Sequence, residues 1–375
     1  MYMAYHFLVR NPLILKMAKN PDRTSIRRME HSSQRLQGHL SQIREAEMEI
    51  MAESRRILGI DAREDPSELR GSTPVGRQAS LLERRIGPSS DIVSIEFLEA
   101  GLLAKRSVGR IWDGSEGFST GFLVGLGLMM TAAHCLHSAA EASDMVFQLD
   151  FETHTLGSPV PIREYSLDPA TFFFRDEDYD FAICSVVDFT GVEPPVEHFG
   201  WHVLSARDET ISAQTPVSII QHPQGRAKSL VVHNSHFVDR GNNSDDDRFC
   251  WYSGDTDQGS SGAPVFSPDW QVLAVHRSAI PARSGDGVYL DRAGQPMQRA
   301  GRPVRELADL DNLDDVLFVA NEGTRASRIV RRLSETAMPT PDHERLRQLL
   351  LESWSRPGAF RIARKAALSG LSDVV

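Results

Sequence analysis

The stretch Gln258-Gly259-Ser260-Ser261-Gly262-Ala263-Pro264-Val265 decides how the rest of the chain is interpreted. It places a serine in a turn of small residues directly before an apolar segment. Gly259 allows the backbone to fold back so that successive N–H groups point into one hollow, where they can stabilise an oxyanion. Gly262 and Ala263 leave the Ser261 hydroxyl open to an incoming carbonyl carbon. The stretch predicts a nucleophilic serine, provided that the chain also supplies a base and an orienting group.

Two other segments supply these groups. Thr131-Ala132-Ala133-His134-Cys135 places a histidine after an apolar run, and Asp180-Phe181-Ala182-Ile183 places an aspartate at the start of another. In chain order the three groups are therefore His134, Asp180 and Ser261. Asp178 is the alternative orienting residue, but only Asp180 directly precedes the Phe-Ala-Ile segment.

These three motifs, in this order, resemble those of the chymotrypsin-like serine proteases. The resemblance implies that Ser261 attacks the peptide carbonyl, His134 transfers the proton to the leaving amine, and Asp180 orients the imidazole. It also implies an oxyanion hole made by the backbone N–H groups of Gly259 and Ser261. Short apolar runs separated by turn residues between positions 91 and 275 fit the fold of this family, which is mainly β with a double antiparallel β-barrel.

Further motifs resemble the bacterial glutamyl-endopeptidase branch of this superfamily. They are Gly200-Trp201, His222-Pro223-Gln224-Gly225 and the segment 318–325. The resemblance extends over about residues 86–335, which we take as the protease domain. It implies a bacterial peptidase.

The specificity pocket carries two conflicting signals. Asp255 lies six residues before Ser261, where trypsin-like enzymes keep the carboxylate that binds arginine or lysine. Thr256 and His276, however, match positions that bind a glutamate side chain in glutamyl endopeptidases. A salt bridge from Asp255 to His276 or Arg277 would cancel both signals. We favour a basic residue before the scissile bond.

The segment Arg277-Ser278-Ala279 is expected to pair its backbone with the substrate as an added strand. Residues 281–314, rich in glycine and proline, interrupt the domain after this segment. They would lie beside the pocket and shape or gate it, or they would form a disordered surface insertion.

The composition excludes several classes of protein. A net charge of −10 over 375 residues argues against a general nucleic-acid binder, and no apolar run approaches the length of a membrane span. Three cysteines without metal-like spacing predict reduced thiols in a reducing compartment. We therefore expect a cytoplasmic protein that needs no metal and no cofactor.

The two ends of the chain lie outside the resemblance. Residues 1–85 are expected to form a helical N-terminal extension that ends in a linker, because apolar residues recur at helical spacing between positions 21 and 60. Residues 336–375 are expected to form a C-terminal helical tail. Each terminal segment either packs on the protease or binds a regulatory protein partner.

The sequence thus predicts a serine endopeptidase that hydrolyses protein or peptide substrates. One alternative is a catalytically silent module that keeps the fold and binds peptides or serves as a scaffold. A third hypothesis is an enzyme that stays latent until a partner binds. It is motivated by Ser260, because trypsin-like proenzymes have at this position an aspartate that pairs with a new amino terminus on activation.

Overall fold

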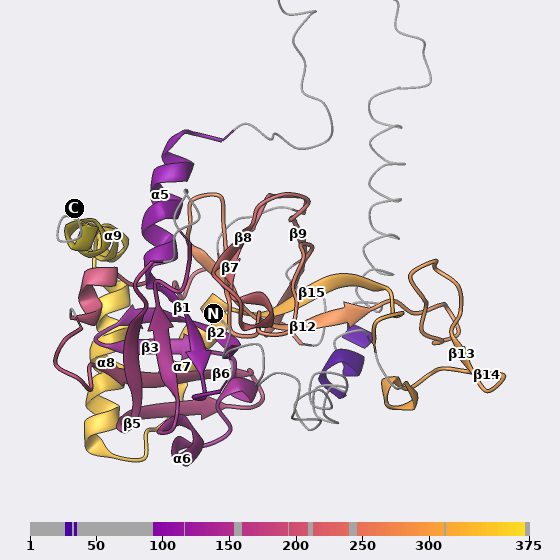
Figure 1. Ribbon diagram of the computed structural model, residues 1–375, viewed down its shortest axis with the longest axis horizontal. Helices are drawn as coiled ribbons and strands as arrows, with labels where there is room; N and C mark the ends of the chain where they lie inside the picture. Colours follow the sequence, from indigo (N-terminus) through magenta and orange to yellow (C-terminus); the bar gives the residue numbers. More distant parts are fainter. Residues whose placement is uncertain are drawn as a thin grey trace, which may run out of the picture.

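The computed structural model describes residues 27–31, 34–35, 93–115, 117–153, 160–193, 195–208, 213–239, 246–310 and 313–371. Most of this part consists of two antiparallel β-structures, with helices packed beside them (Figure 1). Within the predicted extension 1–85, residues 27–31 and 34–35 are helical, whereas the predicted linker lies outside the described residues. None of the described helices is long and apolar enough to cross a membrane.

The first β-structure is a closed barrel in the order β1-β2-β3-β6-β5-β4. Its β2–β3 hairpin turns at Leu126 and Gly127, which both have positive φ, as a two-residue hairpin turn requires. Every residue of β3 is buried, as are all but the last of β6, so the apolar runs of the sequence become the barrel wall. The strands are β1 (Val108–Trp112), β2 (Gly117–Gly125), β3 (Leu128–Thr131), β4 (Val146–Leu149), β5 (Arg163–Asp176) and β6 (Phe181–Val187).

The second β-structure is a seven-stranded sheet in the order β8-β7-β11-β12-β15-β10-β9. A bridge between Pro216 and His236 joins the residues before β7 to those before β9, so the sheet curls back on itself. The prediction of a mainly β, chymotrypsin-like double-barrel architecture is confirmed. The strands are β7 (Ser218–Gln221), β8 (Ser229–Val231), β9 (Phe237–Asp239), β10 (Phe249–Tyr252), β11 (Pro264–Phe266), β12 (Val272–Pro281) and β15 (Phe318–Arg325).

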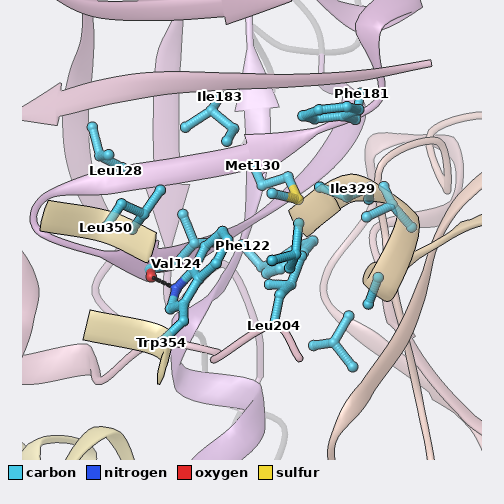
Figure 2. Packing of buried hydrophobic residues seen from close by; sticks show 14 of the residues in the cluster. Phe122, Val124, Leu128, Met130, Phe181, Ile183, Leu204, Ile329, Leu350 and Trp354 are labelled. Carbon is cyan, nitrogen blue, oxygen red and sulfur yellow. Dashed lines mark hydrogen bonds between the residues drawn. The ribbon is translucent and has the colours of Figure 1, made fainter. Parts of the chain in front are cut away.

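The C-terminal helices complete the apolar core of the first barrel. Figure 2 shows Leu350 and Trp354 packed with barrel side chains that include Phe122 and Leu128. The indole Nε1 of Trp354 donates a hydrogen bond of 2.8 Å to the carbonyl of Val124. Of the two alternatives for the C-terminal tail, the structure therefore has it packed on the core. The helices are α7 (Ala326–Glu335), α8 (Pro341–Ser355) and α9 (Ala359–Leu371).

The insertion between β12 and β15 has a small core of its own. Tyr289, Val304, Leu307 and Val316 are almost completely buried in it, and the partly buried Met29 of the N-terminal helical segment packs against them. The insertion contains β13 (Gln298–Arg299), β14 (Arg302–Pro303) and the 3-10 helix η6 (Leu307–Asp309). Over its described residues, the alternative of a disordered surface insertion is wrong, because these four side chains bury one another.

The remaining described elements are short. They are α5 (Glu96–Ala104), α6 (Ala139–Ala142) and the 3-10 helices η2 (Lys105–Ser107), η3 (Ala133–Cys135), η4 (Val196–Phe199) and η5 (Pro223–Gly225). Of these, η3 carries the histidine predicted to act as the base.

Candidate active site

His134 and Asp180 are in direct contact. The buried strand β3 ends at Thr131, and η3 then turns His134 toward the β5–β6 connection, where Asp180 lies. The imidazole Nδ1 is 3.0 Å from Oδ1 and 3.1 Å from Oδ2 of Asp180. The backbone N–H of His134 also donates to Oδ1, at 3.1 Å. Asp180, and not the exposed Asp178, is therefore the residue that orients the imidazole.

The carboxylate of Asp180 is buried and surrounded by positive groups. Its backbone has φ of +51°, a left-handed conformation that aspartate tolerates better than most residues. Arg277 Nε and Arg28 Nε each lie 3.2 Å from Oδ2. Burial opposes ionisation, but His134, Arg277 and Arg28 together hold the pKa of this carboxyl well below its usual range. Asp180 is therefore ionised wherever the protein is folded near neutral pH.

The contact that lowers the pKa of Asp180 raises the pKa of His134. Burial disfavours its charged form, but the carboxylate of Asp180 outweighs burial and raises the pKa of His134 from 6.5 to about 9. His134 and Ser261 line the same cleft, and the imidazole can accept a proton there in its neutral form, which prevails above about pH 9.

The turn that carries Ser261 is pressed between the two barrels. Gly259 and Gly262 have φ of +92° and +84°, which favour glycine. A Cβ on Gly262 would come within 2.1 Å of Thr131 Oγ1, and one on Gly259 within 2.6 Å of the His222 carbonyl. A larger residue at Gly262 would push the serine turn away from the strand that leads to His134, and one at Gly259 would push it away from the segment 222–225.

Thr120 on β2 ties this turn to the first barrel. Its hydroxyl donates to the Gly259 carbonyl at 2.8 Å and accepts from the His222 N–H at 2.9 Å. Its backbone N–H donates to the Ser261 carbonyl at 2.9 Å. With these two carbonyls engaged, the N–H groups of Gly259 and Ser261 donate to no group in the described part of the chain. They are available as the predicted oxyanion hole.

Ser260 stabilises the turn without any charge. It is fully buried; its hydroxyl accepts from the Asp257 N–H at 3.0 Å, and its own N–H donates to the Asp257 carbonyl at 2.9 Å. The turn before the nucleophile is thus closed locally by one serine.

One cleft of about 980 Å³ brings the predicted site residues together. His134, Gly259 and Ser261 line it, and so do the predicted substrate-binding residues, which are Asp255, Thr256, His276, Arg277, Ser278 and Ala279. The sequence-based selection of residues therefore converges on one place in space.

The side chains predicted to form the specificity pocket differ in their hydrogen-bond partners. Asp255 is exposed, and its side chain forms no hydrogen bond or ion pair within the described ranges. Thr256 Oγ1 donates to Asn321 Oδ1 at 2.8 Å. His276 is buried, with Nδ1 2.7 Å from the hydroxyl of Tyr252, and burial together with the charge of His134 lowers its pKa to about 3. His276 is therefore neutral near pH 7, and the side chain of Asp255 is open to the cleft.

The suggested salt bridge between Asp255 and Arg277 is wrong. The Arg277 side chain turns away from Asp255, into the protein, where Nη1 lies 2.5 Å from Oε1 of the fully buried Glu322. The Arg277 side chain is thus engaged inside the protein by Asp180 and Glu322. The pairing of β12 with the serine-bearing segment ends at His276, whose carbonyl accepts from the Gly262 N–H at 2.9 Å. The next residues, 277–279, border the cleft.

Arg277 was expected at the site for its backbone, but nothing in the sequence indicated that its side chain joins the charge network behind Asp180. Three further residues were missed by reasoning from the sequence: Thr120, which holds the serine turn, and Arg28 and Glu322, which belong to that charge network. Each lies far along the chain from its partner, so no local motif could have pointed to it. In the described ranges, no group of three or more His, Cys, Asp or Glu residues is placed to hold a metal ion.

Comparison with known proteins places the middle of the chain in a known family. Residues 119–275 match the family model described as the trypsin-like peptidase domain. The protein y4fB of Sinorhizobium fredii (strain NBRC 101917 / NGR234) is 31% identical over 283 residues, which are 71% of this chain and 41% of the relative. The chain therefore spans less than half the length of that relative.

Solved protease structures are similar at low identity. An inactive mutant form of Rv3671c from M. tuberculosis H37Rv is 16% identical with a TM-score of 0.40, over 69% of this chain and 98% of the other. A Glu endopeptidase structure is 16% identical with a TM-score of 0.37, over 59% of this chain and 85% of the other. The family match, together with the closed six-stranded barrel, identifies residues 119–275 as a trypsin-like peptidase domain with the chymotrypsin-like fold.

Proposed function

We propose that this protein is a serine endopeptidase that acts through His134, Asp180 and Ser261. The observation that carries the proposal is the contact of His134 Nδ1 with the buried carboxylate of Asp180, beside a cleft that Ser261 also lines. Burying the carboxylate of Asp180 costs free energy, so stability alone gives little reason to place it against a histidine at the cleft that Ser261 lines.

The chemistry follows from the geometry. Ser261 Oγ forms a bond to the peptide carbonyl carbon while His134 takes its proton, and Asp180 stabilises the imidazolium. The N–H groups of Gly259 and Ser261 bind the oxyanion, and one such donor is worth roughly 3 kcal/mol of the barrier. The C–N bond then breaks as His134 gives the proton to the amine. Water, deprotonated by His134, hydrolyses the acyl-enzyme and frees the serine.

The substrate would be a protein or peptide that binds as an extra strand along residues 277–279. We propose a basic residue before the scissile bond, because the carboxylate of Asp255 lines the cleft and is not engaged by any described side chain. We also propose a cytoplasmic setting, since the three cysteines are all buried and free.

Hydrolysis of unfolded casein by the purified full-length protein tests the proposal. The wild-type chain should release peptides, and Ser261→Ala should release none while keeping the same thermal unfolding temperature. Equal activity of the two chains would show a contaminating protease. No activity in either chain, with the fold intact, would favour the silent peptide-binding module.

A further inference from the structure

Two buried carboxylates lie one behind the other at the active site. Asp180 holds His134, and Glu322 on β15 lies behind it with no exposed side-chain surface. Arg277 bridges them, with Nε 3.2 Å from Asp180 Oδ2 and Nη1 2.5 Å from Glu322 Oε1. Arg277 and the imidazole of His134 are thus positive groups that these two carboxylates meet outside the N-terminal extension.

The N-terminal extension supplies two further positive charges to this network. Arg28 Nε lies 3.2 Å from Asp180 Oδ2, and Arg35 Nη2 lies 2.5 Å from Glu322 Oε1. The two arginines are seven positions apart in the sequence, and each lies in a described helical part of the extension, 27–31 and 34–35. Each carboxylate thus receives one guanidinium from this segment in addition to the one that it shares through Arg277.

Further contacts hold the same segment in place. The carboxylate of Glu30 accepts from the Leu307 N–H at 3.1 Å, and Met29 packs on the small core of the insertion. In Figure 1 the indigo helical segment lies beside β12 and close to the insertion. Arg28 and Met29 also line the catalytic cleft. Ion pairs, a hydrogen bond and an apolar contact all seat the segment beside the catalytic carboxylate.

We propose that Arg28 is a positioning residue of the catalytic centre, delivered to the triad aspartate by the docked N-terminal helix. The proposal rests on the assignment of His134, Asp180 and Ser261 as the triad. Arg28 holds Oδ2 of Asp180, and its charge competes with the imidazolium of His134 for that carboxylate. An extension outside the matched peptidase domain would then set the basicity of the catalytic histidine.

Several other groups face His134 and Asp180 and would stay constant in the test. Arg277 and His276 face them from β12, and Glu322 lies behind Arg277. Cys135 lies next to His134. Arg175 on β5 donates to the Ala133 carbonyl at 3.1 Å. None of them is altered by a substitution at position 28. Any change in the titration of His134 is therefore attributable to Arg28.

The experiment is histidine-selective nitrogen-15 NMR of the full-length Ser261→Ala chain, with the His134 signal assigned through His134→Ala. Arg28→Gln should move the titration midpoint of His134 to higher pH by about one unit, because one positive charge leaves the neighbourhood of Asp180. Arg28→Lys should restore most of the shift. Arg27→Gln is the matched control, since Arg27 lies on the same segment and is exposed.

A midpoint in Arg28→Gln that equals that of Arg27→Gln, or that moves to lower pH, would overturn the proposal. This readout needs no turnover, so it separates the role of Arg28 from the proposed function. In the enzyme with Ser261 intact, the pH midpoint of fluorophosphonate labelling should shift in the same direction. Labelling that is absent from the wild type would contradict the proposed function, whereas labelling with an unshifted midpoint would contradict only the role of Arg28.

Discussion

Removing the hydroxyl of Thr120 should both destabilise the protein and weaken the oxyanion hole. Thr120→Val keeps the shape of the side chain but deletes the donor to the Gly259 carbonyl and the acceptor of the His222 N–H. Both backbone groups lie in the interior, where an unpaired polar group costs about 1 to 3 kcal/mol. The free energy of unfolding should therefore fall by about 2 to 6 kcal/mol.

The catalytic effect follows from the same bonds. Once its carbonyl is released, Gly259 can rotate, because glycine has wide conformational freedom, and its N–H no longer points reliably at the oxyanion. Loss of one oxyanion donor lowers the rate by roughly 100-fold or more. We therefore expect Thr120→Val to label with a fluorophosphonate about 100-fold more slowly than the wild type.

Urea unfolding and the labelling rate measure the two effects separately. Thr120→Ser is the matched control, since it keeps the hydroxyl and loses one methyl group, worth about 1 kcal/mol. It should label at nearly the wild-type rate. If Thr120→Val folds and labels within twofold of the wild type, the hydroxyl does not hold the serine turn and the reasoning is wrong.

Three further predictions concern the base, the core and the pocket. Because only neutral His134 can accept a proton, the rate of fluorophosphonate labelling should rise with pH around a midpoint near 9. Asp180→Asn should move that midpoint down toward 6.5 and lower the labelling rate at high pH by roughly 10⁴-fold. An unmoved midpoint would contradict this prediction. Trp354→Ala should lower the free energy of unfolding by about 3 to 5 kcal/mol, since the indole is buried against the first barrel, and a loss below 1 kcal/mol in urea unfolding would refute the packing argument. In a peptide library, Asp255→Asn should reduce cleavage after arginine and lysine about tenfold while His276→Ala leaves that preference in place, and a wild-type preference for glutamate would reverse the assignment.

The fold and the catalytic pair were predictable because their signals are local. Small-residue turns, apolar runs and a histidine or aspartate at the end of a run are each visible within about ten residues of sequence. His134 and Asp180 follow from such runs, and their contact at 3.0 Å matches the order of the motifs. The glycines beside Ser261 have the positive φ values that their positions predict.

The direction of Arg277 was not predictable in the same way. The pairing register of β12 with β15 shifts between His276 and Ser278, so an extra residue is accommodated there. A bulge of this kind changes which side chains face inward, and no residue type in this segment predicts the bulge. The side chain of Arg277 consequently reaches Asp180 and Glu322, where regular alternation gives no reason to expect it.

The core of the insertion and the docking of the N-terminal helical segment also could not be predicted from the sequence. Glycine and proline between residues 281 and 314 predict a loop, yet a few apolar side chains suffice to give it a core. The partners of Arg28 and Arg35 lie far away in the sequence, one in the β5–β6 connection and the other on β15. The position of this segment depends on the folded charge network, and the sequence of the segment alone does not reveal it.

The central claim is that His134, Asp180 and Ser261 form a working triad. The most direct test is to incubate the full-length protein with a fluorophosphonate and to locate the adduct by mass spectrometry, alongside Ser261→Ala and His134→Ala. We predict one adduct per chain, on Ser261, in the wild type and none in either variant. A correctly folded wild type that stays unlabelled across pH 6 to 10, or an adduct on another residue, would contradict the claim.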